Sequence, residues 1–241
     1  MDDKRLAIVV GAGPGLGAAL AQRFARASMN VVMACRRPGR VDTLAAEFSG
    51  IGHGVSSRAC HGCDEGSVQA LFEWSEERFG APDVVVYNAG AFVQRALLET
   101  SADEFERCWR IGCMGGFLVG REAARSMSQR SDGRSGGAIL YTGATASLRG
   151  SAGFHNLAVG KFGLRALAQS MARELGPQGI HVAHVVIDGR IRAPAVVEQG
   201  SDDSARLLEP DDIAEAYFQL AMQPRSAWTQ ELDLRPWVER F

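Results

Sequence analysis

Short apolar runs alternate along the chain with segments that repeat apolar residues at helical spacing. The runs predict strands near 5–10, 30–35, 55–60, 84–87, 138–142 and 181–187, and an edge strand near 229–234. The helical spacing predicts helices near 16–27, 41–48, 65–79, 103–127, 153–175 and 211–222, and Asp64 is placed to cap the third of them. A polar loop is expected over residues 128–137.

This alternation of strands and helices determines the fold class. Successive parallel strands need crossover connections, so the pattern predicts a parallel sheet with helices on both faces. No internal repeat, low-complexity tract or shift in composition divides the sequence. We therefore expect an α/β fold, a single doubly wound domain over residues 1–241. Ligands of such folds bind beyond the carboxyl ends of the strands.

Composition narrows the classes of protein further. The 241 residues carry 26 Lys and Arg against 28 Asp and Glu, for a formal net charge of −2. This balance argues against nucleic-acid and membrane-surface partners, which attract a basic surplus. No apolar run approaches the roughly 20 residues that span a bilayer. Five cysteines, an odd number, predict reduced thiols, and we expect a cytoplasmic protein.

Glycines cluster where the first predicted strand ends, in the loop from Gly11 to Gly17. The literal G-x-G-x-x-G pattern fails because Leu16 breaks it, but G-x-x-x-G-x-G fits. Glycines let the backbone approach a pyrophosphate closely, and the amides that open the next helix point toward it. The residues expected to bind a nucleotide here are Gly11, Gly13, Gly15, Leu16 and Gly17.

Two further motifs follow in order, Asn88-Ala89-Gly90 after the fourth strand and Lys161 on the helix after the fifth. Together with the glycine loop they resemble the short-chain dehydrogenase/reductase family over about residues 4–235 of this chain. The resemblance implies a Rossmann-type fold and an NAD(P)-dependent oxidoreductase that acts on a small carbonyl compound or alcohol.

The resemblance also implies roles for particular residues. Lys161 is expected to contact the ribose hydroxyls of the nucleotide, and Asn88-Ala89-Gly90 to pack beside the adenine ribose. His61 stands where the family often has an acidic residue near the adenine. Gly189 follows the sixth strand in Asp188-Gly189, where the family usually has Pro-Gly, and Ala193 replaces a threonine that often binds the carboxamide.

The catalytic positions of the family depart from its pattern. Leu157 stands four residues before Lys161, where the family has a tyrosine, and Ala144 stands at the usual serine. Gly112 occupies the position of an asparagine. Leucine has no proton to exchange and alanine has no hydrogen bond to donate, while general acid–base catalysis is worth roughly 10²–10⁴ in rate. The ordinary mechanism of the family is therefore not expected.

Three other side chains near these positions are candidates to replace the family's tyrosine and serine. His155 lies two positions from Leu157, about 200° around a helix, so it is expected to point away unless the helix begins later. Thr142 and Thr145 have hydroxyls that orient a carbonyl but are too weakly acidic to replace a phenol. Two functions stay open: an oxidoreductase with atypical or weakened catalysis, and a non-catalytic NADP(H)-binding subunit with a regulatory or partner role.

The second predicted strand ends in Cys35-Arg36-Arg37, about 20 residues past the glycine loop. An acidic residue there would bind a free ribose 2′-hydroxyl, and none is present. Two guanidinium groups instead suit a 2′-phosphate. We therefore expect NADP(H) rather than NAD(H).

Three further features of the sequence are weaker indications. Cys60-His61-Gly62-Cys63 has zinc-ligand spacing but no second pair, so core cysteines and no metal are expected. Trp228 and Trp237 either cover the substrate region or an interface or pack in the core, and core packing is favoured. We expect a homodimer or homotetramer formed through the helices near 103–127 and 153–175, because small residues there permit close approach: Gly115, Gly116, Gly120, Ala123, Ala124, Gly160, Ala166 and Ala168.

Overall fold

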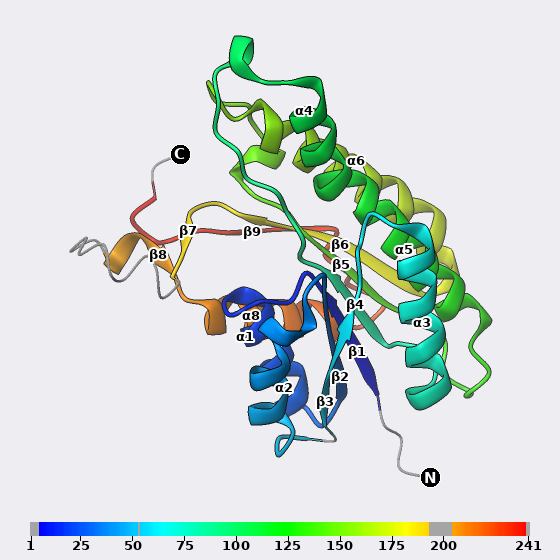
Figure 1. Ribbon diagram of the computed structural model, residues 1–241. Helices are drawn as coiled ribbons and strands as arrows, with labels where there is room; N and C mark the ends of the chain where they lie inside the picture. The colour runs from blue at the N-terminus through cyan, green and yellow to red at the C-terminus, as the bar shows by residue number, and fades with distance from the viewer. Residues whose placement is uncertain (1–4, 53, 193–203, 240–241) are drawn as a thin grey trace.

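The computed structural model describes residues 5–52, 54–192 and 204–239 of the chain. Its main feature is a seven-stranded parallel sheet in the order β3-β2-β1-β4-β5-β6-β9 (Figure 1). The strands are β1 (Leu6–Val10), β2 (Asn30–Cys35), β3 (Val55–Ala59), β4 (Val84–Tyr87), β5 (Gly137–Thr142), β6 (Ile180–Ile187) and β9 (Glu231–Leu234). The strand order reverses between β1 and β4, which confirms the doubly wound α/β fold.

Both faces of the sheet are covered by helices, as the alternating pattern predicted. One face packs against α1 (Leu16–Arg26), α2 (Asp42–Phe48) and α8 (Pro210–Ala221). The other packs against α3 (Glu65–Phe79), α5 (Gly115–Gln129) and α6 (His155–Leu175) (Figure 1). Successive side chains of a strand point to opposite faces, so β1 contributes Ala7 and Val9 to the first core and Leu6, Ile8 and Val10 to the second.

The long helix expected over 103–127 needs correction. The structure has α4 (Ala102–Trp109), a π-helical segment from Arg110 to Met114, and then α5. At the wide turn, a Cβ on Gly160 of α6 would lie 3.1 Å from the Cα of Gly112. The Tyr87 hydroxyl donates to the Ile111 carbonyl at 2.6 Å, which gives a partner to a backbone group in the π-helical segment. Hydrophobic spacing does not record such a change in helix type.

The glycines of α5 correct the argument made for oligomer formation. A Cβ on Gly115 would lie 2.2 Å from the Tyr87 hydroxyl, and one on Gly120 would lie 1.9 Å from the Tyr141 hydroxyl. A Cβ on Gly116 would lie 2.3 Å from Leu164. These three glycines, like Gly160, are needed for packing within the chain, so they do not by themselves support contact with another copy.

Most other boundaries agree with the sequence within two residues, and Asp64 caps α3 by accepting from the Ser67 amide at 2.7 Å. The short parallel pair β7 (Arg190–Ile191) and β8 (Leu207–Leu208) was not predicted. Trp237 is 87% exposed, so its expected place in the core is wrong, whereas Trp228 is half-buried and stacks on His181. Within the described residues, no helix has the length and apolar character needed to cross a membrane.

Candidate functional site

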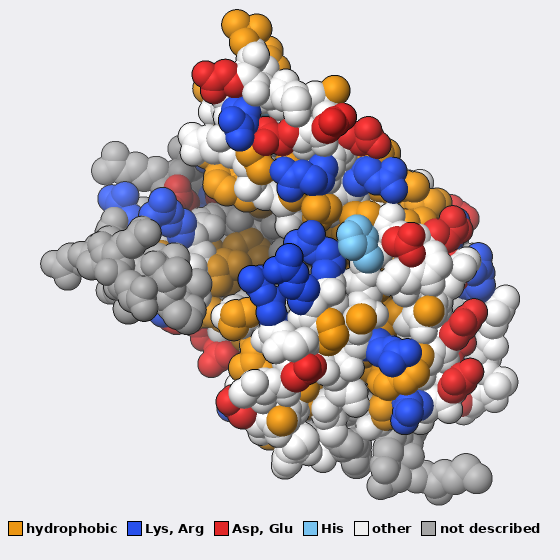
Figure 2. All heavy atoms as spheres, in the orientation of Figure 1, with side chains coloured by type: hydrophobic (Ala, Val, Ile, Leu, Met, Phe, Trp, Pro, Cys, Tyr) orange, Lys and Arg blue, Asp and Glu red, His pale blue; other side chains and the backbone are white. Residues whose placement is uncertain are grey.

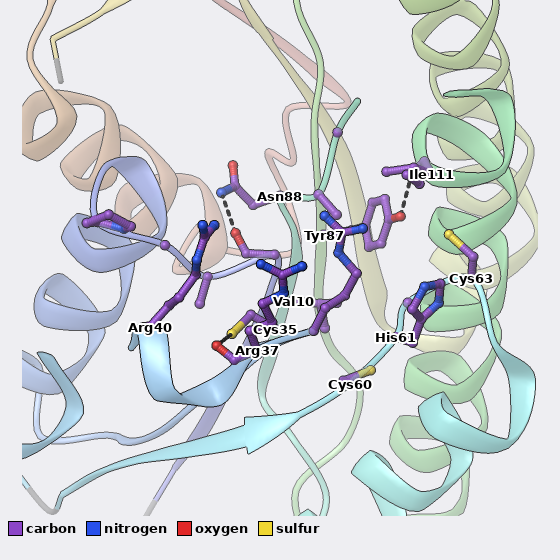
Figure 3. Close-up of a pocket in the computed structure, with 18 residues that line it drawn as sticks. Val10, Cys35, Arg37, Arg40, Cys60, His61, Cys63, Tyr87, Asn88 and Ile111 are labelled. Carbon is purple, nitrogen blue, oxygen red and sulfur yellow. Dashed lines mark hydrogen bonds between the residues drawn. The ribbon is translucent and has the colours of Figure 1, made fainter. Parts of the chain in front are cut away.

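A cavity of about 380 Å³ lies beyond the carboxyl ends of β1, β2, β3 and β4 (Figure 3). Parallel strands bring these four ends to one edge of the sheet, which is where ligands bind in doubly wound folds. The cavity brings together eight residues that the sequence analysis had singled out: Gly11, Gly13, Arg36, Arg37, His61, Asn88, Ala89 and Gly90. The other predicted cofactor residues, Gly15, Leu16, Gly17, Lys161 and Gly189, are not among its lining residues.

The glycine loop and the turn after β4 are packed against each other. Gly11 has a φ of +88°, and a Cβ there would lie 2.4 Å from the Ala89 nitrogen. The Asn88 amide side chain donates to the Gly11 carbonyl at 3.2 Å. A Cβ on Gly17 would lie 2.8 Å from the Ala12 Cα, which explains glycine at the start of α1. Gly13, by contrast, has no such neighbour within 4 Å and lines the cavity.

The charge of the cavity is strongly basic. Arg36 and Arg37 follow β2, and Arg40 belongs to the short 3₁₀ turn after them (Pro38–Arg40). In Figure 2, basic side chains and a histidine gather beside a hollow on this face; the cavity-lining residues of these types are the three arginines and His61. Among the described residues, none that lines the cavity is Asp or Glu. Arg40 was missed because it lies beyond the strand end where the sequence analysis had sought the 2′-position.

Thiols and one phenol line the remaining part of the cavity. Burial raises the pKa of Cys60 to about 11 and also raises the pKa of Cys63, although Arg110 opposes the second shift. Cys60 is buried as expected, whereas Cys63 is half-buried; both line the cavity, as does Cys35, which also packs against the core. Among the described residues no group of His, Cys, Asp or Glu is arranged to hold a metal ion.

Lys161 lies beside this cavity on α6. Its side chain is 5% exposed, and its Nζ donates to the Thr142 carbonyl at 2.6 Å. A Cβ on Gly90 would lie 3.6 Å from the same Nζ, so the lysine adjoins the turn after β4. Burial lowers the pKa of Lys161 to about 8. Leu157 precedes it by one helical turn, so residues 157 and 161 share a face of α6 as the spacing required.

His155 is held by contacts with Thr100 and α4. It is the first residue of α6, and its Nε2 lies 2.8 Å from the Thr100 hydroxyl. Its ring also stacks on Phe105, with 6.4 Å between centroids. These contacts hold the imidazole toward α4, so the expectation that it points away from residue 157 is confirmed.

The carboxyl ends of β5 and β6 hold a polar pair that sequence reasoning missed. The Thr145 hydroxyl, just after Ala144, donates to Oδ1 of Asp188, and the guanidinium of Arg235 lies 3.5 Å from Oδ2. Asp188 is 6% exposed. Thr142 has a different hydrogen-bond partner, because its hydroxyl accepts from the Tyr217 hydroxyl at 2.9 Å. The only sign of this pair in the sequence was that Asp188 stands where the family usually has a proline. Ala193, which was expected to replace a threonine near the carboxamide, lies outside the described residues.

Comparison with known proteins identifies the family. The family model described as short chain dehydrogenase matches residues 5–204. The chain belongs to the short-chain dehydrogenase/reductase family. The resemblance carried by the glycine loop, Asn88-Ala89-Gly90 and Lys161 is thereby confirmed. Members of this family bind a nicotinamide cofactor, and the chain is a nucleotide-binding oxidoreductase of that family.

Several short-chain dehydrogenases are similar over nearly their whole length. A short-chain dehydrogenase from Rhodopseudomonas palustris is 38% identical, with a TM-score of 0.82 over 97% of this chain and 99% of that one. An alcohol dehydrogenase from the archaeon Thermococcus sibiricus, complexed with 5-hydroxy-NADP, is 26% identical, with a TM-score of 0.86 over 98% of both chains. The farnesol dehydrogenase of Aedes aegypti is 30% identical over 98% of each sequence.

Proposed function

We propose that this chain is an NADP(H)-dependent short-chain oxidoreductase in which the usual catalytic tyrosine and serine are replaced by Leu157 and Ala144. The observation that carries the cofactor assignment is the basic cavity. Arg36, Arg37 and Arg40 line it, and no lining residue is acidic. Planar guanidinium groups suit the charge and geometry of a phosphate, whereas a free ribose 2′-hydroxyl favours a carboxylate. Two similar structures contain NADP or 5-hydroxy-NADP, which supports the proposal.

The residues present fit a nicotinamide dinucleotide. The open space at Gly13 admits a pyrophosphate close to the backbone, next to the start of α1. The three arginines would hold the 2′-phosphate, with His61 near the adenine and Asn88 to Gly90 beside its ribose. Lys161 would donate to the other ribose, and Gly189 would lie at the nicotinamide end. The bound cofactor supplies hydride transfer.

Two consequences for catalysis follow from this proposal. Leu157 and Ala144 leave the reacting oxygen without the family's proton donor and hydroxyl, so reduction of general carbonyl compounds is expected to be slow. The same substitutions favour a second candidate function, a non-catalytic NADP(H)-binding protein that acts as a regulatory or partner subunit. Turnover of any alcohol or carbonyl substrate distinguishes the two.

A fluorescence titration tests the cofactor assignment. We expect NADPH to bind at least about tenfold more tightly than NADH, since loss of a charge-assisted contact costs about 1.5–3 kcal/mol. The double variant Arg36→Ala with Arg37→Ala should bind NADPH more weakly and bind NADH with unchanged affinity. Arg58→Ala is the matched control, because Arg58 on β3 packs against Trp74 and does not line the cavity. Equal binding of the two nucleotides by the wild type would refute the assignment.

The quaternary structure is part of the same proposal. We infer a homodimer or homotetramer in which residues 1–241 form one domain. Five large apolar side chains, each between 37% and 42% exposed, support the interface on α4, α5 and α6. They form the α4–α6 face: Phe105, Trp109, Phe117, Val159 and Phe162. Its large side chains replace the small residues as the reason to expect self-association.

A further inference from the structure

The pair formed by Thr145 and Asp188 continues the edge of the sheet that holds the nucleotide cavity. The cavity covers the ends of β1 to β4, while Thr145 follows β5 and Asp188 follows β6. Thr145 lies three residues beyond Thr142, whose carbonyl oxygen accepts from Lys161. The pair lies along this edge of the sheet, next to Ala144, which stands at the position of the family's serine.

The hydrogen-bond donors and acceptors of this pair determine which chemical groups it can bind. A threonine hydroxyl has one proton, and Thr145 gives it to Oδ1 of Asp188. What remains on the Thr145 oxygen is acceptor capacity only. Thr145 is a half-buried residue, and an oxygen with acceptor capacity only matches a group with a proton to donate, such as an alcohol, and repels a carbonyl oxygen. The serine of other family members keeps its proton free for a carbonyl.

We propose that Thr145 and Asp188 bind the hydroxyl of an alcohol substrate and accept its proton, so that the enzyme works as an alcohol dehydrogenase without the tyrosine. The inference rests on the proposed function and adds to it the form of the substrate that is bound and the route of the proton.

The step balances without any further reactant. The alcohol O–H donates to the Thr145 oxygen, and the Thr145 proton passes to Oδ1 of Asp188. The carbon–hydrogen bond supplies the two electrons that leave as hydride to the oxidised cofactor, and the oxygen forms the carbonyl. The proton ends on Asp188, and the half-exposed positions of Thr145 and Arg235 connect the pair with solvent.

A purely structural role predicts different behaviour. Arg235 lies on the segment after β9 and pairs with both Asp188 and Asp233. If Asp188 only holds Arg235, removing either carboxylate has the same effect. Asp233→Asn is therefore the matched control, since it removes one partner of Arg235 and leaves Thr145 untouched.

The first measurement is ligand binding, which does not depend on turnover. Alcohol and ketone pairs of one carbon skeleton, from cyclohexanol and cyclohexanone to 2-undecanol and 2-undecanone, are titrated by saturation-transfer NMR against protein saturated with NADP⁺. We expect at least one alcohol to bind about tenfold more tightly than its ketone, by analogy with one charge-assisted contact. Thr145→Val should abolish this preference, and Thr145→Ser should retain it.

The second measurement is oxidation of the preferred alcohol. Asp188→Asn keeps an oxygen that accepts from Thr145, so the binding preference should persist while kcat falls at least about 10²-fold. Asp233→Asn should leave kcat within about twofold of the wild type, as expected for an exposed ion pair. Circular dichroism of each variant shows whether it folds.

Three results would overturn the inference. They are equal binding of alcohols and ketones by the wild type, no binding or oxidation of any alcohol, and equal losses in Asp188→Asn and Asp233→Asn. A protein that binds no NADPH contradicts the proposed function itself. Tight NADPH binding without a preference for alcohols contradicts only the assignment of Thr145 and Asp188.

Discussion

The ammonium group of Lys161 lies 2.6 Å from the carbonyl oxygen of Thr142, in a position where the lysine side chain is 5% exposed. Burial lowers the pKa of Lys161 to about 8, and among the described residues no carboxylate contributes to that shift. A buried cation is thus maintained by one strand carbonyl. This relationship places a charge next to the turn after β4, and it costs the protein stability at neutral pH.

That cost should disappear as Lys161 loses its proton. The native pKa lies below the ordinary lysine value of 10.5, so between about pH 8 and 10.5 the unfolded chain binds more protons than the native one. The contribution of Lys161 to the free energy of unfolding therefore rises with pH in that window. In the wild type this rise amounts to about 1.4 kcal/mol for each pKa unit by which the native and unfolded values differ. In Lys161→Met the rise should be missing. Urea titrations of both proteins from pH 7 to 10 measure it, and parallel curves would contradict the assignment.

Restoring the family's side chains should restore carbonyl reduction. Leu157→Tyr places a phenol one helical turn before Lys161, whose ammonium lowers the phenol's pKa. Ala144→Ser adds a hydroxyl that donates to the carbonyl. Because both serve one transition state, the double variant should gain at least about 10² in the rate of NADPH-dependent ketone reduction, and more than the single variants predict. A double variant no faster than the wild type would show that these positions do not face the substrate.

Gly120 tests the packing of α5, and Gly150, a glycine in a loop, serves as the control. Alanine normally stabilises a helix by about 1 kcal/mol relative to glycine. Gly120→Ala should instead destabilise the fold by about 1–3 kcal/mol, because the new Cβ would lie 1.9 Å from the Tyr141 hydroxyl. Gly150→Ala, with nothing within 4 Å, should be nearly neutral. Tyr141→Phe added to Gly120→Ala should recover part of the loss; denaturant unfolding that shows none would refute the assigned clash.

The α4–α6 face should govern self-association. Phe117→Asp with Phe162→Asp places two charges on this apolar surface, and burying them without partners would oppose assembly. We expect the apparent dimer dissociation constant to rise at least about 10²-fold in light scattering. Leu98→Asp is the control, because Leu98 is 99% exposed but lies outside this face. A wild type that is monomeric at micromolar concentration would contradict the interface.

The fold could be predicted from the sequence because the hydrophobic patterns that indicate strands and helices are local and repeated. Each strand is a short apolar run, and side chains at helical spacing cover both faces, so the order of elements followed directly. The π-helical segment escaped prediction because Gly112 and Gly160 meet across two helices that lie far apart in sequence. A single-sequence pattern records no such contact.

The candidate site was predictable to a smaller extent. Gly11, Arg36 and Asn88 sit at strand ends, where the topology alone makes them neighbours. Arg40 was missed because it lies beyond the end of β2, and the pair of Thr145 with Asp188 was missed because its members follow different strands. His155 shows the opposite case, because helix geometry was sufficient to predict that its ring turns away from residue 157.

The place of β9 in the sheet has a consequence for biosynthesis. β6 is paired on one side by β5 and on the other by β9, which is made more than forty residues later. While the ribosome is still synthesising those residues, the eight-residue strand β6 has an open row of backbone amides and carbonyls on the side that β9 later covers. Until β9 is added, this open edge is a site at which the nascent chain can aggregate, and chaperones that bind exposed strand edges would act on it then.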